Sequence, residues 1–363
     1  MRTMRFSARA ALEMVNNFAL EPITGEELKA IIQRPVQKED IPVFLPQTQY
    51  DPRDMRAAIG HVFPELAKAL TDGSYQGLYG GRPPIITSYY KKGGTGKSTV
   101  TTGLGVALAR MGFRVLMIDA DDQATLSDLL GVDTDSKDLF TLANYLLDRR
   151  PPAPKDHVLS IYENADLDLI PADIELSCFD EEALPRTSRE FIFYNFINTN
   201  NYFLKKYDFI FVDNAPGSTL LQFNSLIPSD MLLCVVTLDV TSLKSMRLMN
   251  KHLERIKELH VPVPRKKIQI IINRYTESQR HNRQGLDIVK DIYGGQIMPV
   301  VVPNYIGAAR QGDIAGQSVS IVEGEPSSVI AKALMKLALL LVDNLAIRPL
   351  KLPVPPAFKD IAL

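Results

Sequence analysis

A glycine-rich segment constrains the fold more than any other part of this sequence. Residues 93–99 read Gly-Gly-Thr-Gly-Lys-Ser-Thr, between an apolar run at Ile85–Tyr89 and a helix-like stretch at Lys97–Met111. Glycines let the backbone wrap closely around a polyphosphate, and the helix that follows adds the partial positive charge of its N-terminus. A simple glycine-rich turn would not require the strand, the helix and the Gly-Lys-Ser triplet together. The segment therefore predicts a P-loop on an α/β scaffold.

The residues of this loop have separate expected tasks. Lys97 is placed to reach the β- and γ-phosphates, and the Ser98 hydroxyl suits Mg²⁺. Lys92 has two interpretations, a surface lysine or a lysine committed to nucleotide, because its ammonium would repel Lys97 unless a polyanion lay between them. The residues expected to surround the nucleotide phosphates are Lys92, Gly93, Gly94, Thr95, Gly96, Lys97, Ser98 and Thr99.

Apolar runs alternate with helix-like stretches after this loop. The expected strands are Ile85–Tyr89, Phe113–Ile118, Leu167–Ile170, Phe209–Val212, Met231–Val236, Ile268–Ile272 and Ile297–Val302. The expected helices are Lys97–Met111, Glu190–Lys206, Ser242–Leu259, Gly285–Tyr293 and Ser327–Asn344. Continuous β-branched runs suit strands that are buried on both faces of a parallel sheet. The pattern predicts an α/β fold with a doubly wound, mostly parallel sheet, which binds ligands beyond the carboxyl ends of its strands.

The first eighty residues have a different pattern. It predicts short helices at Ser7–Phe18 and Gly25–Ile32, an extended or looped stretch at Gln33–Tyr50, and a helix from Pro52 capped by Asp51. A second short helix is expected after Pro64, and the glycine- and proline-rich stretch Gly73–Pro84 predicts a domain boundary. The expected organisation is a small helical region at 1–80, a P-loop domain at 84–346 and a proline-rich tail at 347–363.

Composition excludes few functions. The formal net charge of this 363-residue chain is −1, so its overall charge predicts no partner. Cys178 and Cys234 stand among apolar residues, which favours reduced thiols over a disulfide or a metal site. No apolar run is long enough to cross a bilayer, and the first residues suit a helix better than a targeting peptide. We expect a cytoplasmic protein.

From Ile85 onward, the sequence resembles the ParA/MinD group of deviant Walker-type ATPases. The group's KGGxGK[ST] signature matches Lys92–Ser98, and its DxDxQ stretch matches Asp119, Asp121 and Gln123. An apolar strand that ends in aspartate before a proline turn is matched by Asp213 and Pro216. The resemblance spans roughly residues 84–344 and is best to partition ATPases of the larger plasmid type, which have an N-terminal extension. One departure is Asp122, which replaces the usual proline and adds a charge near the phosphates.

The resemblance implies an ATP switch with slow, Mg²⁺-dependent hydrolysis. It assigns Asp121 to the water and metal shell, and Asp213 to Mg²⁺ through water. It also implies that Lys92 reaches across a sandwich homodimer to the partner's phosphates, and that a ParB-type adaptor stimulates hydrolysis. Asn273 matches the residue that contacts adenine, and Pro303 lies in the segment that closes the base pocket. The alternative task of Asp119 and Asp213 is helix capping, and that of Asn273 is a turn.

Residues 244–290 hold a local excess of positive charge. Twelve Lys or Arg residues stand with four acidic residues in this stretch. Any single one of these cations suits a solvated surface, but a cluster binds DNA phosphates without sequence preference, and more weakly as salt rises. The resemblance implies the same activity for the ATP-bound dimer on the nucleoid. The candidate DNA-binding residues are Arg247, Lys251, Arg274 and Arg280.

Related ATPases have other functions. A MinD-like membrane switch ends in a basic amphipathic helix, whereas this chain ends in a proline-rich segment, so no stable membrane association is expected. An iron–sulfur carrier needs cysteine ligands with a spacing that Cys178 and Cys234 lack. A ParA-like ATPase that positions another cargo would have the same core, so this alternative stays open.

Overall fold

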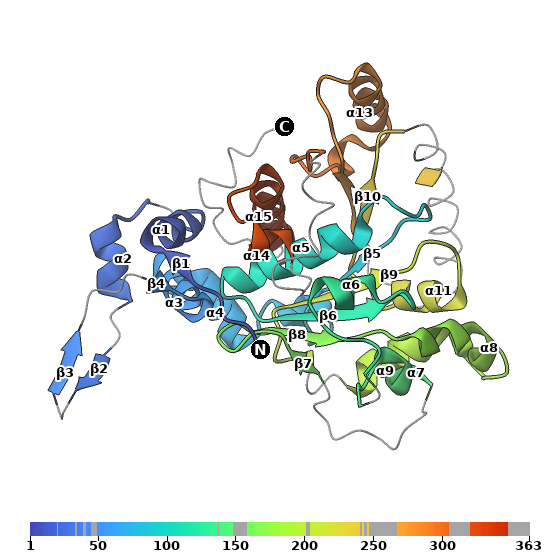
Figure 1. Ribbon diagram of the computed structural model, residues 1–363, viewed down its shortest axis with the longest axis horizontal. Coiled ribbons are helices and arrows are strands. Elements are labelled where there is room, and N and C mark those ends of the chain that lie inside the picture. Colours follow the sequence, from blue (N-terminus) through green and yellow to red (C-terminus); the bar gives the residue numbers. More distant parts are fainter. Residues whose placement is uncertain are drawn as a thin grey trace.

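The sheet of this α/β fold has seven strands. The computed structural model describes residues 1–19, 21–32, 35–38, 41–44, 49–136, 138–147, 158–200, 204–239, 242, 245–246, 267–304 and 320–347. Within them the strand order is β11-β10-β5-β9-β6-β8-β7, and every neighbouring pair is parallel except β7 with β8 (Figure 1). The strands are β5 (Ile85–Ser88), β6 (Val115–Ala120), β7 (Leu159–Ser160), β8 (Leu167–Ile170), β9 (Phe209–Asn214), β10 (Met231–Val236) and β11 (Lys267–Ile272). The predicted doubly wound, mostly parallel sheet is confirmed.

One predicted strand is wrong. Ile297–Val302 forms no strand, and this stretch meets β11 only at isolated points. The Met298 N–H donates to the Ile270 carbonyl at 2.9 Å, and the Val302 N–H donates to the Ile272 carbonyl at 2.8 Å. The two donors are four positions apart and their acceptors only two, so this stretch carries two extra residues and cannot form a continuous ladder with β11.

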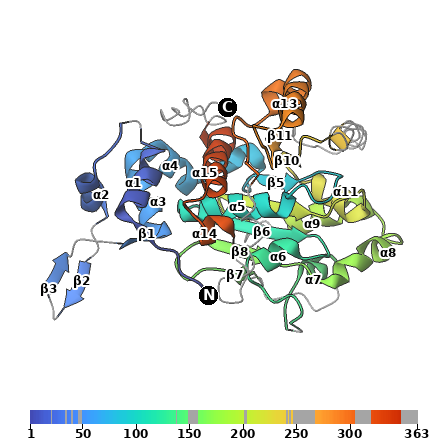
Figure 2. The same cartoon turned by 45° about the horizontal axis from the view of Figure 1, so that its top comes forward.

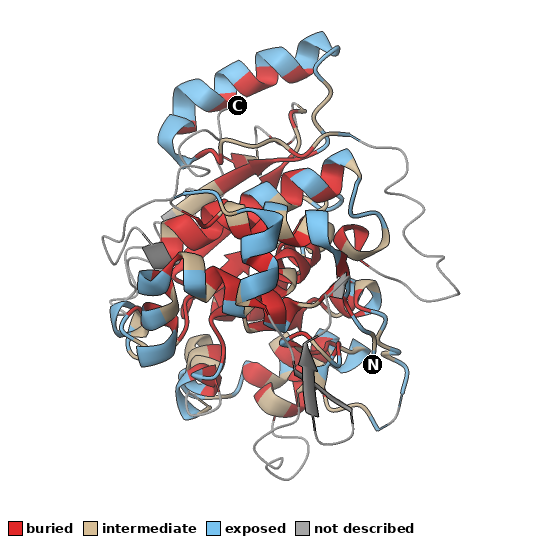
Figure 3. Cartoon of the chain, turned by 90° about the vertical axis from the view of Figure 1, so that its left-hand side faces the viewer, coloured by how far each residue is buried: buried red, intermediate tan, exposed pale blue. Residues whose placement is uncertain are grey.

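Helices cover both faces of the sheet, and their outer surfaces are exposed (Figures 2 and 3). One hydrophobic cluster joins Ile86, Met117 and Phe211 of the strands to α5, α14 and α15. A second cluster joins the opposite strand face to α7, α8, α9 and α11. These helices are α5 (Lys97–Arg110), α7 (Leu142–Leu146), α8 (Phe179–Ala183), α9 (Ile192–Thr199), α11 (Leu220–Leu226), α14 (Ile321–Gly324) and α15 (Val329–Val342); α6 (Thr125–Leu129) and α13 (Arg280–Tyr293) complete the described set of this domain.

The predicted helix boundaries hold to different degrees. The helix at 97–111 agrees with α5 to within one residue, and α15 lies inside the predicted 327–344. The stretch 190–206 contains the shorter α9, preceded by a 3₁₀ turn at Arg189–Phe191, and α13 starts five residues before the predicted Gly285. Most of the predicted helix at 242–259 lies outside the described residues, and so does nearly all of the tail at 347–363.

The N-terminal region packs against the helical layer that contains α5 and α15. Its elements are β1 (Phe6–Ser7), α1 (Ala8–Asn16), α2 (Gly25–Ile31), β2 (Pro35–Lys38), β3 (Ile41–Phe44), β4 (Gln49–Tyr50), α3 (Pro52–Val62) and α4 (Pro64–Asp72). The β2–β3 hairpin, which sequence reasoning described only as extended or looped, stands away from the rest in Figures 1 and 2. Asp51 caps α3 as predicted, since its Oδ1 accepts the N–H groups of Arg53 at 2.9 Å and Asp54 at 3.1 Å.

The contact between this region and the P-loop domain is apolar at its centre. The ring of Phe18 packs on Phe113, with 6.0 Å between centroids, and Phe113 packs edge-on against Phe209 at 5.5 Å. Gly112 allows the close approach of α3, because its φ is +84° and a Cβ there would lie 2.4 Å from the carbonyl oxygen of Pro52. The N-terminal region therefore shares a hydrophobic core with the sheet domain.

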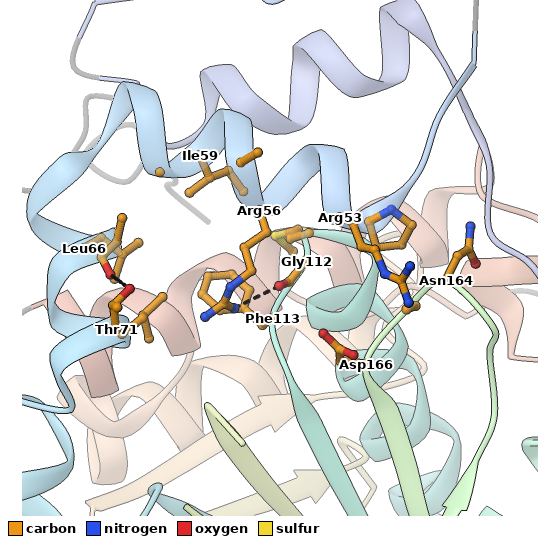
Figure 4. Close-up of a pocket in the computed structure, with 16 residues that line it drawn as sticks. Arg53, Arg56, Ile59, Leu66, Thr71, Gly112, Phe113, Asn164 and Asp166 are labelled. Carbon is orange, nitrogen blue, oxygen red and sulfur yellow. Dashed lines mark hydrogen bonds between the residues drawn. The ribbon is translucent and has the colours of Figure 1, made fainter. Parts of the chain in front are cut away.

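A cavity of about 340 Å³ lies in this contact, at the amino ends of β6 and β8. Figure 4 shows Arg53, Arg56, Ile59 and Leu66 on one side of it, and the Gly112–Phe113 turn with Asp166 on the other. The Arg56 guanidinium donates to the Gly112 carbonyl at 3.0 Å. The cavity is thus at the opposite edge of the sheet from the P-loop.

Two further expectations can be compared with the structure. No helix among the described residues is long and apolar enough to span a membrane. Neither Cys178 nor Cys234 forms a disulfide, and burial raises the pKa of the Cys234 thiol to about 12.

Candidate nucleotide and magnesium site

The P-loop joins the carboxyl end of β5 to the start of α5. Gly94 and Gly96 have φ values of +70° and +87°, in the left-handed region that favours glycine. A Cβ at Gly96 would also lie 2.4 Å from the Asn273 amide nitrogen, so the loop can turn this tightly only with glycine there. The turn points the first backbone N–H groups of α5 toward the site, as binding of phosphate requires.

Lys97 is the first residue of α5 and is almost fully buried, with 5% of its surface exposed. Burial lowers the pKa of its ammonium, while the nearby carboxylates of Asp213 and Asp121 raise it. A buried cation beside two carboxylates at the mouth of a P-loop is suited to hold a polyphosphate.

Three aspartates lie at the carboxyl ends of β6 and β9. Asp119 on β6 is in register with Asp213 on β9, and β9 lies between β6 and the P-loop strand β5. The Asp119 Oδ2 accepts the Ser127 N–H at 2.9 Å and the Ser127 hydroxyl at 2.7 Å. These bonds tie α6 to the sheet through Ser127, within the helix, while the N-cap residue of α6 is Ala124. Burial, and then the charge of Asp213, raise the pKa of Asp119 to about 8.

Asp121 follows β6, which β9 separates from the P-loop strand β5, so it lies two strands away from that strand and not one as predicted. Its Oδ1 accepts the Gln123 N–H at 3.0 Å. Burial raises the pKa of Asp121 to about 6. The side chain of Asp122, which replaces the family's usual proline, is less buried than Asp121.

Asp213 has one satisfied and one unsatisfied carboxylate oxygen. The Ser88 hydroxyl donates to Oδ1 at 2.5 Å, whereas Oδ2 is buried and makes no hydrogen bond of normal geometry. Burial raises the pKa of Asp213, and the hydroxyls of Ser88 and Ser98 and the charge of Lys97 lower it. A buried carboxylate oxygen without a partner, beside a serine of the P-loop, fits the oxygen donors that hydrated Mg²⁺ prefers.

Lys92 is paired within its own chain. Its Nζ lies 2.7 Å from each carboxylate oxygen of Asp239 and 3.3 Å from the Ser242 hydroxyl. The ion pair is partly exposed, with 29% of the lysine and 42% of the aspartate side chain accessible. Lys92 is therefore not a solvated surface lysine in this single chain, and its predicted reach to a partner would require it to leave Asp239.

Asn273 lies at the end of β11 and contacts the P-loop. Its Nδ2 donates to the Thr95 carbonyl at 2.7 Å, and its Oδ1 accepts the Arg274 N–H at 2.9 Å. Pro303 lies on the neighbouring segment, which bridges to Tyr275. The structure thus brings Asn273 and Pro303 to the edge of the site, and their contact with adenine stays a prediction.

The candidate DNA-binding residues are only partly described. Arg274 and Arg280 are exposed at the connection between β11 and α13, and Arg274 has a φ of +55°. Arg247 and Lys251 lie outside the described residues.

Sequence reasoning missed Ser88 and Asp239, and also the contact of Asn273 with Thr95. Ser88 is 125 positions from Asp213, and Lys92 is 147 positions from Asp239. A polar residue at the carboxyl end of the P-loop strand, where such sheets bind ligands, was the available signal for Ser88.

Comparison with known proteins agrees with this geometry. A family described as AAA domain matches residues 84–270, which is more than half of the chain. An uncharacterised protein of Methanocaldococcus jannaschii is 31% identical over 63% of this chain and 88% of its own length. The chromosome partitioning protein ParA of Caulobacter vibrioides is 28% identical over 61% of this chain and 81% of its own length.

Among solved structures, a putative plasmid partition protein of Borrelia burgdorferi bound to AMPPNP is similar, with a TM-score of 0.56. It is 22% identical, and the match covers 72% of this chain and 98% of that protein. At this identity the likeness shows the fold alone. The matched family, the related sequences and the P-loop site agree, and the chain belongs to the ParA family of P-loop ATPases.

Proposed function

We propose that this protein is an Mg²⁺-dependent ATP switch that partitions DNA. The observation that carries the proposal is that three side chains meet at the nucleotide edge of the sheet. Lys97 is buried and Ser98 follows it in the P-loop, and Asp213 on β9 has an Oδ2 with no hydrogen bond of normal geometry. The loop amides and Lys97 hold the phosphates, while Ser98 and Asp213 hold Mg²⁺, directly or through its water. Bound Mg²⁺ neutralises charge on the phosphates. Asp121 orients the attacking water.

ATP in this proposal assembles a homodimer, and slow hydrolysis ends it. Lys92 is the residue that would reach the partner's phosphates, in exchange for its pair with Asp239. The ATP-bound dimer binds DNA without sequence preference, and a ParB-type adaptor stimulates hydrolysis. The proposed place of action is the cytoplasm, on the nucleoid. The N-terminal region is the proposed site of contact with the adaptor or of self-regulation.

The exposed arginines support the DNA-binding part of the proposal. Asn273 directly follows β11 and donates to the P-loop carbonyl of Thr95, and Arg274 is the next residue, whereas Arg280 begins α13. Binding of nucleotide to the loop can therefore move Arg274 through Asn273. Arg247 and Lys251 are further proposed contacts from the same basic stretch.

The test is binding to a random-sequence DNA duplex with ATP, with ADP and without nucleotide, over a series of salt concentrations. We expect binding that requires ATP, weakens as salt rises and disappears in Lys97→Ala. Retention of nucleotide binding without DNA binding in any state would overturn the DNA part of the proposal, and would favour a ParA-like switch that positions a different cargo. Tight ATP-dependent binding to liposomes would instead favour a membrane switch.

A further inference from the structure

Ser88 is the last residue of the P-loop strand β5 and lies beside Asp213 on the neighbouring strand β9. Thr87 is in register with Val212, so the next residue of each strand, Ser88 and Asp213, are also neighbours. Both side chains are fully buried. The Ser88 hydroxyl donates to the Asp213 Oδ1 at 2.5 Å.

The Ser88 hydroxyl oxygen has a second contact, since the Asn214 N–H donates to it at 3.1 Å. An ionised carboxylate can only accept, so the single hydroxyl proton is directed to Asp213. Asn214 is itself held, because its amide donates to the Ser88 carbonyl at 3.2 Å and accepts the Ser225 hydroxyl at 2.8 Å.

Hydrogen bonding holds Oδ1, whereas Oδ2 of Asp213 makes no hydrogen bond of normal geometry, although the hydroxyls of Ser98 and Thr101 lie near the carboxylate. Lys97 and Ser98 of the P-loop lie close enough to Asp213 to affect its charge. We propose that Ser88 is a positioning residue for Mg²⁺, since it holds the Asp213 carboxylate with Oδ2 available to the hydrated ion. The inference rests on the proposed function above. It adds a residue outside the P-loop signature and outside the matched aspartate motifs.

The experiment compares the affinity of a fluorescent ATP analogue in Mg²⁺ and in EDTA, which reports on the site without hydrolysis. For Ser88→Ala we expect the Mg²⁺ concentration that gives half-maximal tightening of nucleotide binding to rise about 10-fold, the range seen when the partner of a metal ligand is removed. Affinity in EDTA should stay the same, because the phosphate-binding amides and Lys97 are intact. Ser88→Thr keeps the hydroxyl and should restore most of the Mg²⁺ response.

Ser225→Ala is the matched control, since Ser225 bonds to Asn214 but not to Asp213. An unchanged Mg²⁺ response in Ser88→Ala would overturn the inference, and so would an equal loss in Ser225→Ala. If Ser88→Ala does not fold, Ser88→Cys retains the size with a weaker donor, and a Mg²⁺ response like that of the wild type would again overturn it. A wild-type protein whose nucleotide affinity ignores Mg²⁺ would refute the proposed switch itself.

Discussion

Strand β9 has a buried aspartate at each end, and the two carboxylates are partnered in opposite ways. Asp208 directly precedes the strand, at the contact with the N-terminal region, and is paired with Arg56 and Arg114 at 2.7 Å each. The backbone N–H of Arg114 also donates to it at 2.8 Å. Asp213 lies near the other end, at the nucleotide edge, and one of its oxygens has no protein partner.

The contrast separates a structural charge from a functional one. A buried carboxylate with complete ion pairing is suited to hold two parts of a molecule together, because removal of either partner leaves an uncompensated charge. A buried carboxylate that is left incomplete costs stability and is retained where a ligand completes it. The same strand thus connects the junction with the N-terminal region to the proposed Mg²⁺ site.

The largest expected effect is on stability, from substitution of Asp208 at the start of β9. Asp208→Asn should lower the free energy of unfolding by about 3 kcal/mol, because it leaves the guanidinium groups of Arg56 and Arg114 without their counter-charge. Chemical denaturation of the nucleotide-free protein measures this. The folded fraction should bind nucleotide with unchanged affinity, and weaker binding would break the proposed separation of the two ends.

Lys97→Ala should have the next largest effect, at the nucleotide edge of the sheet beside Asp213. We expect hydrolysis of ATP to fall by at least about 100-fold, because the variant loses the buried cation that faces the phosphates. Steady-state phosphate release measures this, with circular dichroism to check the fold. Lys91→Ala is the matched control from the same loop, and an equal loss in it would mean that Lys97 has no special role.

Asp239→Asn tests whether Lys92 must leave its ion pair with Asp239 before it can reach a partner chain. The Lys92–Asp239 pair is partly exposed, so its loss should tighten ATP-dependent dimerisation by no more than about five-fold. Sedimentation equilibrium with a non-hydrolysable ATP analogue measures the effect. Lys92→Ala should abolish the dimer, and a weaker dimer in Asp239→Asn would show that Asp239 itself supports the interface.

The smallest effect is expected from the exposed arginines. Arg274→Glu and Arg280→Glu should each reduce the slope of log affinity against log salt by about one, if each contacts one phosphate. Fluorescence anisotropy with a random duplex measures this slope. An unchanged slope in both variants would place the DNA contact elsewhere in the basic stretch.

The sequence predicted most of the sheet domain because its signals are local. The P-loop, the buried strands around it and the aspartates at strand ends are each readable within about ten residues, and the structure has them at the same edge of the sheet. The two-residue β7 was missed because so short a strand has no pattern. The wrong strand at 297–302 is apolar and β-branched, but a local pattern does not show that it has two more residues than the part of β11 that it follows.

The pairing of side chains could not be predicted in the same way. The bonds of Ser88 to Asp213 and of Lys92 to Asp239 depend on which strands are neighbours, and β5 is placed between β9 and β10, both more than a hundred residues later. Nor does the sequence show that Asn273 braces the P-loop through the Thr95 carbonyl, since this contact joins residues 178 positions apart.

The two borders of the sheet have a consequence for self-assembly. On one side the last strand is β7, which is antiparallel and two residues long; on the other, residues 297–303 occupy points along β11 with their backbone. Short or covered borders offer little backbone to which an incoming strand could add. Among the described residues, growth of a polymer by addition of strands to the seven-stranded sheet is therefore disfavoured at both borders, and an assembly that uses this domain would depend on docking of its surface side chains.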